Sequence, residues 1–150
     1  MPAIKGKPTL CIDFDGVIHD YKAGWQGGEI YGDVVPGFFG WCVESSKFFV
    51  LAVYSSRSKD DRMRSDMSHW LSKKLLEWWD LQPGSEELPV PFQFNIVADK
   101  PAAWLTIDDR CIRFDGDWTD ECFRPENLLA FKPWTTRPPV VKRVKSQTVS

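Results

Sequence analysis

Residues 10–20 read LCIDFDGVIHD, and this stretch decides how the rest of the chain is interpreted. The apolar residues 10–12 predict a short strand that is buried on both faces. Side chains alternate along an extended backbone, so Asp13 and Asp15 are expected to project together from the carboxyl end of this strand. Gly16 permits a sharp exit from it. Two carboxylates this close repel unless a cation or a shared proton intervenes, so the stretch predicts either a cation site or an acidic turn.

The composition is that of a single folded domain with an uneven distribution of charge. A chain of 150 residues, 43% of them hydrophobic, can bury a sizeable core. Residues 132–150 carry five Lys or Arg and no acid, so residues 1–131 carry a net charge of −7. An acidic body argues against broad binding to a nucleic-acid backbone. We therefore expect a domain over residues 1–131 and a basic, Pro-containing tail over 132–150, which is either solvated or in contact with an anionic partner.

The cysteines and the apolar runs indicate the compartment. Cys11, Cys42, Cys111 and Cys122 lack the spacing of a metal site, and free thiols in a reducing environment explain them better than disulfides do. Residues 1–9 contain no apolar signal segment, and no run approaches the roughly 18 apolar residues of a membrane helix. The sequence therefore predicts a soluble, cytoplasmic protein with no membrane partner.

Apolar periodicity predicts two helices and a series of short strands. Pro36 suits the first position of a helix that ends near residue 47. Ser58 and Asp61 have the spacing of a capping box at the start of a second helix, which ends near residue 81. Strands are expected at residues 10–12, 48–54, 92–97, 104–107, 111–114 and 128–131, with loops at 16–35 and 82–91. This order predicts an α/β fold with a mainly parallel sheet and helices on its faces.

Polar side chains follow four of the expected strands. They are Asp13 and Asp15, Ser55, Lys100, and Asp108 with Asp109. Because ligands of parallel sheets bind at the carboxyl ends of the strands, we expect these side chains to meet at one edge. Carboxylate oxygens suit Mg²⁺, a hydroxyl and an ammonium suit phosphate oxygens, and a carboxylate can also be a nucleophile. The pattern thus predicts Mg²⁺-dependent chemistry on a phosphorylated substrate.

These motifs resemble those of the haloacid dehalogenase superfamily of phosphohydrolases, over residues 9 to about 116. Residues 13–17, DFDGV, match its first motif, DxDG[TV] after an apolar strand. The remaining motifs are matched by Ser55 with Arg57 in the T-x-R form, by Lys100, and by Asp108 with Asp109 after another apolar strand. The resemblance implies a Rossmann-like three-layer sandwich.

The resemblance also implies hydrolysis of a phosphomonoester through an aspartyl-phosphate. Asp13 would be the nucleophile and a metal ligand. Asp15 would be the general acid and base, and its backbone carbonyl would contact the metal. The other roles follow by position. Ser55, Arg57 and Lys100 would bind the phosphoryl group, and Lys100 would also orient Asp13. Asp108 would be a metal ligand, and Asp109 would contact the metal, its water or a neighbouring ligand. The transition state would be stabilised mainly by positioning and electrostatics.

Neither gap between the motifs has room for the cap domain that many family members carry. The chain therefore resembles a small capless member, whose open site suits a large substrate or is closed by a second copy in a homo-oligomer. A nucleotide, a polynucleotide end and a sugar phosphate all remain candidate substrates. The sequence leaves the roles of several other side chains open. Trp25, Tyr31 and Trp118 either contact substrate at the rim of the site or pack against the protein, and Asp115 and Asp117 are either extra acids near the metal or solvated loop acids. We interpret His69 as a surface or packing residue rather than a ligand.

Two other classes of function use the same residue types. A phospho-accepting receiver domain also combines Asp, Mg²⁺, Ser or Thr and Lys, but its acidic pair comes early and its acceptor Asp lies on a middle strand. The order of the motifs here therefore disfavours a receiver. A catalytically silent binding module on the same fold is the other alternative, and the intact acidic set argues against it.

Overall fold

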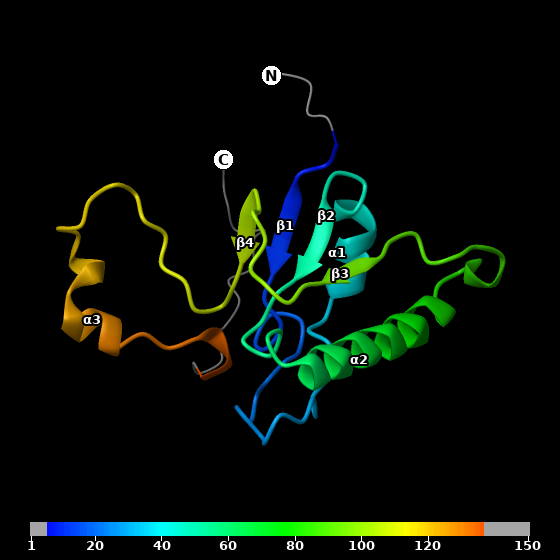
Figure 1. Ribbon diagram of the computed structural model, residues 1–150, viewed down its shortest axis with the longest axis horizontal. Coiled ribbons are helices and arrows are strands. Elements are labelled where there is room, and N and C mark those ends of the chain that lie inside the picture. The colour runs from blue at the N-terminus through cyan, green and yellow to red at the C-terminus, as the bar shows by residue number, and fades with distance from the viewer. Residues whose placement is uncertain (1–5, 137–150) are drawn as a thin grey trace, which may run out of the picture.

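The computed structural model describes residues 6–136 and has an α/β fold built on one sheet (Figure 1). The strands are β1 (Thr9–Ile12), β2 (Val50–Val53), β3 (Phe94–Ile96) and β4 (Leu105–Ile107). The helices are α1 (Phe38–Ser45), α2 (Asp61–Asp80) and α3 (Pro125–Leu129), with 3-10 turns at Ser85–Glu87, Glu121–Phe123 and Trp134–Thr136. Four expected strands and both expected helices are thus confirmed, with somewhat different ends.

All four strands are parallel, in the order β3-β2-β1-β4. β1 is therefore central, and the chain leaves it first towards β2 and later returns to its other side as β4. The carboxyl ends of β1 and β4 form the point at which the strand order reverses, where ligands of open α/β sheets bind. Ile12 pairs with Ile107, and the amide of Asp13 donates to the carbonyl of Ile107 at 2.9 Å. The sheet thus fixes Asp13 beside the residues that follow β4.

Both long helices pack on one face of the sheet. Leu10 and Ile12 of β1 and Leu51 and Val53 of β2 form one buried cluster with side chains of α1 (Phe38, Phe39, Cys42) and α2 (Met67, Leu71, Leu75). Two successive right-handed crossovers in the same direction place their helices on the same face, as here. Within residues 6–136 this gives a sheet with one helical layer, so a three-layer sandwich is not confirmed. No described helix is both long and apolar enough to cross a membrane.

The starts of both helices differ from the sequence expectation. Gly37 has a φ of 89°, a left-handed conformation that keeps Pro36 out of α1. At α2 the cap is Asp60, whose carboxylate accepts from the amide of Met63 at 2.9 Å. The capping box expected from Ser58 is wrong, because the Ser58 hydroxyl accepts instead from the amide of Ser55 at 3.0 Å.

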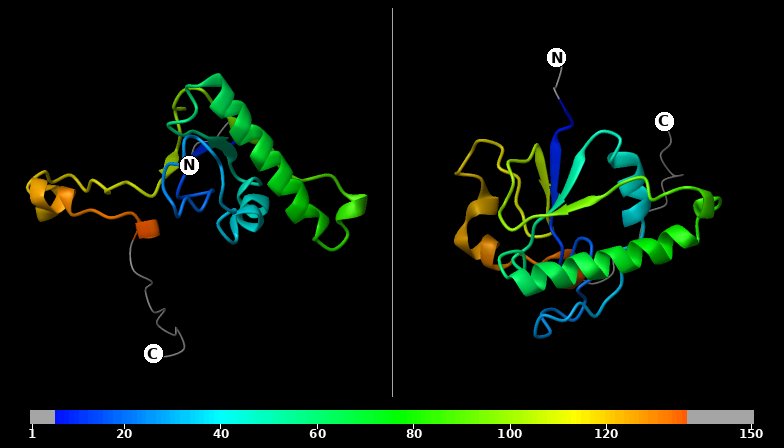
Figure 2. Two further views of the ribbon diagram at one scale, coloured as in Figure 1. Left: turned by 90° about the horizontal axis from the view of Figure 1, so that it is seen from below. Right: turned by 45° about the vertical axis from the view of Figure 1, so that its right-hand side comes forward.

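The chain after β4 departs most from the sequence expectation. The expected strand at 111–114 is irregular, and the expected strand at 128–131 is replaced by α3, whose first residue is Pro125. Residues 110–132, the C-terminal arm, are almost wholly exposed and extend beyond β4, away from α1 and α2 (Figure 2). Three aromatic rings, those of Phe114, Trp118 and Phe123, pack together within the arm.

The chain returns to the turn after β1 at the start of the expected tail. Pro133 is buried, and the indole N–H of Trp134 donates to the carbonyl of Gly16 at 2.6 Å. Pro133 and the indole of Trp134 are therefore held against the domain, whereas residues 132, 134 and 136 remain exposed. The rest of the expected tail, 137–150, lies outside the described residues.

Candidate functional site

Four residues that the sequence nominates line one cavity at the carboxyl ends of the strands. The cavity measures about 260 Å³, and Asp13, Ser55, Lys100 and Asp108 contribute to its wall. Asp13 follows β1, Ser55 follows β2 and Asp108 follows β4, while Lys100 comes from the connection between β3 and β4. The parallel sheet therefore brings together residues that are up to 95 positions apart, counted from Asp13 to Asp108.

Three carboxylates converge at this edge. Asp13, Asp108 and Asp109 each offer a carboxylate oxygen, and these oxygens all lie within 4.8 Å of one another. The pairing of Ile12 with Ile107 explains the convergence, because it places the residues after β1 and β4 side by side. Among the described residues, none of the three carboxylates has an ion pair within 4.0 Å.

The electrostatics of this acid cluster favour a bound cation. Burial, reinforced by the negative charges of Asp108 and Asp109, raises the pKa of Asp13 to about 7. Burial and a hydrogen bond with Asp108 also raise the pKa of Asp109. The Oδ1 atom of Asp109 is buried without a hydrogen-bond partner, which is costly for a polar atom. An oxygen-rich cluster with an unsatisfied buried oxygen fits a hard divalent cation such as Mg²⁺.

Asp15 does not join this cluster, contrary to the expectation that it projects with Asp13. Its Oδ2 atom accepts from Nε of Arg57 at 2.7 Å, and its Oδ1 atom accepts from Nη2 of Arg57 at 3.2 Å. Nδ1 of His19 lies 2.9 Å from the same Oδ1. The reason is the backbone: the carbonyl of Phe14 accepts the amides of Val17, Ile18 and His19, so a tight turn begins immediately after Asp13.

The partners of Asp15 determine its charge. Burial alone would raise the pKa of Asp15, but the hydrogen bonds from His19 and Arg57 outweigh it and hold that pKa below its ordinary value. Asp13 and Asp15 are therefore two carboxyl groups with pKa values pushed in opposite directions. Such a separation is typical of paired groups with different roles in catalysis.

Arg57 lies against Asp15 rather than in the cavity where the sequence placed it. Its side chain is 1% exposed. Besides Asp15, it donates from Nη1 to the carbonyl of Gly28 at 2.6 Å, and its guanidinium lies 4.8 Å from the ring centroid of Trp25. Arg57 therefore ties the Gly-rich loop to Asp15, and its expected contact with substrate phosphate is not supported by its placement.

Ser55 and Lys100 differ in how firmly the structure holds them. Ser55 is 3% exposed, and its hydroxyl accepts from the amide of Arg57 at 3.2 Å, so its oxygen is fixed at the cavity wall. Lys100 is exposed and has no ion pair within 4.0 Å among the described residues. Its ammonium can thus meet an anion, and within residues 6–136 it makes no ion pair with Asp13, so the orientation of Asp13 by Lys100 stays a prediction.

Sequence reasoning missed Arg110, which lines the same cavity. Its amide donates to Oδ1 of Asp108 at 2.9 Å, so the turn that follows β4 also sets the position of Arg110. Its place directly after the acidic pair was the available signal. Two cationic residues, Lys100 and Arg110, therefore line the same cavity as Asp13 and Asp108.

The residues considered at the rim are mostly engaged elsewhere. Tyr31 donates its hydroxyl to the carbonyl of Gly24 at 2.8 Å and so braces the Gly-rich loop. Asp115 pairs with Arg113 at 2.7 Å, and Asp117 accepts from the amide of Thr119 at 2.9 Å, as solvated loop acids do. Trp118 packs within the C-terminal arm, whereas Trp25 remains half exposed over Arg57.

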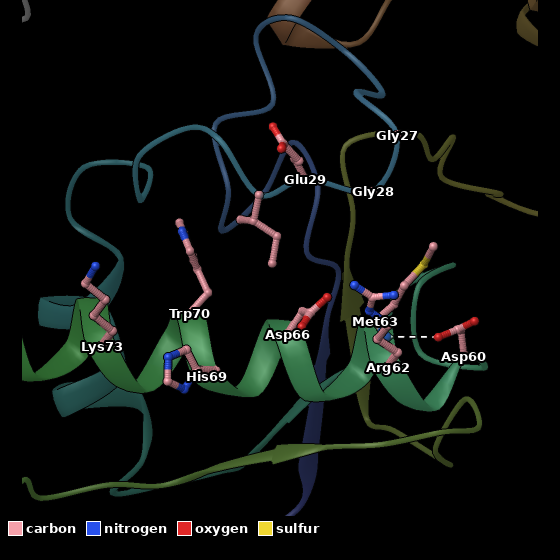
Figure 3. A pocket seen from close by; sticks show the side chains of 11 residues that line it. Gly27, Gly28, Glu29, Asp60, Arg62, Met63, Asp66, His69, Trp70 and Lys73 are labelled. Atoms are coloured by element: carbon pink, nitrogen blue, oxygen red, sulfur yellow. Dashed lines mark hydrogen bonds between the residues drawn. The ribbon is translucent and has the colours of Figure 1, made fainter.

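A second and larger hollow of about 610 Å³ lies between α2 and the loop at Gly27–Glu29. Figure 3 shows Asp66 and Trp70 rising from α2 towards that loop, with His69 on the same helix. Its charged lining mixes acids with Arg62 and Lys73, and none of the nominated catalytic residues lines it. The smaller cavity is therefore the better candidate, because chemistry-bearing groups gather there.

Comparison with protein-family models, with curated proteins and with solved structures finds no match to this chain.

Proposed function

We propose that this protein is a Mg²⁺-dependent phosphomonoester hydrolase that works through an aspartyl-phosphate on Asp13. One observation carries the proposal: the carboxylates of Asp13, Asp108 and Asp109 lie within 4.8 Å of one another, next to a cavity that Ser55 and Lys100 also line. Carboxylates, a hydroxyl and an ammonium at one sheet edge are the parts that phosphoryl transfer requires.

Asp13, Asp108 and Asp109 would hold the cation, with the backbone carbonyl of Asp15 as a further oxygen. When bound, Mg²⁺ supplies positive charge that neutralises the phosphoryl oxygens and favours the ionised form of Asp13. Ser55, Lys100 and Arg110 would bind the phosphoryl oxygens from the other walls of the cavity. The Ser55 hydroxyl is held in place before substrate arrives, so its contribution would be pre-organised, whereas the exposed side chains of Lys100 and Arg110 would be ordered by the phosphate.

The reaction would proceed in two displacements at phosphorus. In the first, a carboxylate oxygen of Asp13 bonds to phosphorus, the ester P–O bond breaks, and Asp15 gives its proton to the departing oxygen. In the second, Asp15 takes a proton from water, whose oxygen displaces Asp13 and releases inorganic phosphate. The lowered pKa of Asp15 suits the second step, and the negative charge of an arriving phosphate raises that pKa for the first.

The open cavity leaves the substrate class broad. The connection from β1 to α1 is a loop, and the connection from β2 to β3 holds α2 and one 3-10 turn, which supports the absence of a folded cap. A nucleotide, a polynucleotide end and a sugar phosphate remain the proposed candidates, and a homo-oligomer is compatible with them. Cys11 and Cys42 are buried free thiols, which supports a reducing, cytoplasmic location. A Rossmann-like three-layer sandwich stays a prediction.

Hydrolysis of p-nitrophenyl phosphate tests the proposal. We expect turnover with Mg²⁺, none with EDTA, and none in Asp13→Asn although circular dichroism shows a folded protein. Asp115→Asn is the matched control, because it removes an exposed carboxylate from the arm, and it should keep wild-type turnover. Equal activity of Asp13→Asn and wild type would remove Asp13 as nucleophile. A lasting phosphoryl group without release of phosphate would favour a receiver, and the absence of both would favour a silent binding module.

A further inference from the structure

His19 is a buried residue, 0% exposed, that the proposed mechanism does not yet use. Its two ring nitrogens have different partners: Nδ1 lies 2.9 Å from Oδ1 of Asp15, and Nε2 accepts from the amide of Gly32 at 2.9 Å. Because a backbone amide can only donate, Nε2 must carry a lone pair. The proton of a neutral ring is then on Nδ1, and His19 donates it to Asp15.

The surroundings hold the ring in this orientation. The rings of Phe14, Tyr31 and Trp70 lie 5.0–5.7 Å from it, centroid to centroid. The carbonyl of His19 accepts from the amide of Gly16 at 2.8 Å, so His19 closes the same turn that carries Asp15. The amide of Gly32 can lie this close to the His19 ring because Gly32 has no side chain. A Cβ at this position would collide with Asp20 and with Nε2 of His19.

The hydrogen bonds to Asp15 are distributed unequally between its two oxygens. An ionised carboxylate has about four acceptor sites, two on each oxygen. Among residues 6–136, Oδ1 receives both His19 Nδ1 and Arg57 Nη2, whereas Oδ2 receives only Arg57 Nε. Oδ1 is therefore fully occupied, and Oδ2 keeps one acceptor site that no described residue fills.

We propose that His19 is a positioning residue which, together with Arg57, reserves Oδ2 of Asp15 as the atom that gives and takes the proton in both steps of the reaction. The inference rests on the proposed function, because it needs Asp15 to be the general acid and base. It adds a second consequence: through Gly32, the conformation of the Gly-rich loop is tied to the orientation of Asp15.

Two variants separate the two contacts of His19. The amide nitrogen of His19→Asn can occupy the place of Nδ1 and donate to Asp15, but the side chain is too short to reach Gly32. His19→Gln reaches the Gly32 amide but withdraws the donor from Asp15. With p-nitrophenyl phosphate and Mg²⁺, we expect kcat of His19→Gln to fall about 10- to 100-fold with KM within about twofold, and His19→Asn to recover most of kcat.

A second readout follows from the double role of Asp15. If His19→Gln impairs the base step, the phosphoryl group stays on Asp13, so a burst of nitrophenol should precede slow turnover, and acid-quenched protein should retain phosphate. Urea unfolding of both variants measures any loss of stability separately. The proposal would be overturned if kcat fell equally in the two variants. It would also be overturned if the variants lost stability while the kcat of their folded fraction was unchanged, because His19 would then be a packing residue.

The tautomer can be measured in the wild-type protein without any activity. The chain has only two histidines, His19 and His69, so a ¹⁵N-histidine spectrum of wild type and His69→Gln assigns the buried ring. We expect a protonated Nδ1 and an unprotonated Nε2 at neutral pH. A protonated Nε2 would overturn the inference even if phosphate esters are hydrolysed, whereas absent hydrolysis with the expected tautomer would overturn the proposed function.

Discussion

Asp13 is the residue at which burial and charge act most strongly. Its pKa of about 7 means that the folded protein without a cation prefers to keep a proton there. A group whose pKa is raised on folding contributes stability at low pH and loses it as pH rises through the folded pKa. Asp15 has a lowered pKa, so its contribution is lost only under acid conditions. Between about pH 5 and 8, the titration of the acid cluster therefore dominates this site.

The first prediction concerns the melting temperature in that pH window. In EDTA, we expect the melting temperature of wild type to fall more from about pH 5.5 to 8 than that of Asp13→Asn, which cannot ionise at this position. Mg²⁺ should raise the melting temperature of wild type more at pH 8 than at pH 5.5, because fewer protons must be displaced. The same Mg²⁺ stabilisation at both pH values would contradict a raised pKa at Asp13.

Gly16 provides a second prediction at the scale of one residue. Its φ is 82°, and a Cβ there would collide with the carboxylate of Asp109. Gly116 has a φ of 97°, and no atom of the described residues lies within 4 Å of an added Cβ there. Both Gly→Ala changes should cost about 1 kcal/mol through backbone strain, but only Gly16→Ala should also abolish stabilisation by Mg²⁺. Equal Mg²⁺ shifts in the two variants would show that Gly16 does not crowd the acid cluster.

At the scale of the element, the segment at Trp134–Thr136 links the C-terminal arm to the turn after β1. Trp134→Phe keeps an aromatic ring but removes the indole donor to Gly16, so we expect the free energy of unfolding to fall by about 1 kcal/mol. Trp118→Phe, in the exposed arm, is the control and should change it by less than about 0.5 kcal/mol. Urea unfolding checks both, and an equal effect would mean that Trp134 does not anchor the segment.

The elements also show what the sequence could predict. Apolar runs of strand length identified all four strands, although burial explains such runs only for β1 and β2, since β3 is partly buried and β4 is exposed. The strand predicted at 128–131 was wrong, because a short apolar run occurs both in strands and at helix ends. Pro125, which suits the first turn of a helix, was the better signal there. The direction of Asp15 could not be predicted, since it depends on a turn that the buried Phe14 organises.

At the scale of the whole molecule, strand order creates the candidate site. Because β1 lies between β2 and β4, residues that follow three different strands reach one cavity. The convergence of Asp13, Ser55, Lys100 and Asp108 was predictable from parallel topology alone. The engagement of Arg57 with Asp15 was not, since only the fold of the Gly-rich loop brings Gly28 and Trp25 to that guanidinium.

The central claim is that Asp13, Asp108 and Asp109 together hold a divalent cation and that Asp13 is also the nucleophile. The most direct measurement is to quench the protein with acid during turnover of p-nitrophenyl phosphate and to locate any phosphoryl group by peptide mass spectrometry. We predict a phosphoryl group on Asp13 that forms with Mg²⁺ and is absent both in EDTA and in Asp108→Asn. A phosphoryl group on another residue, or one that forms equally well in EDTA, would contradict the account.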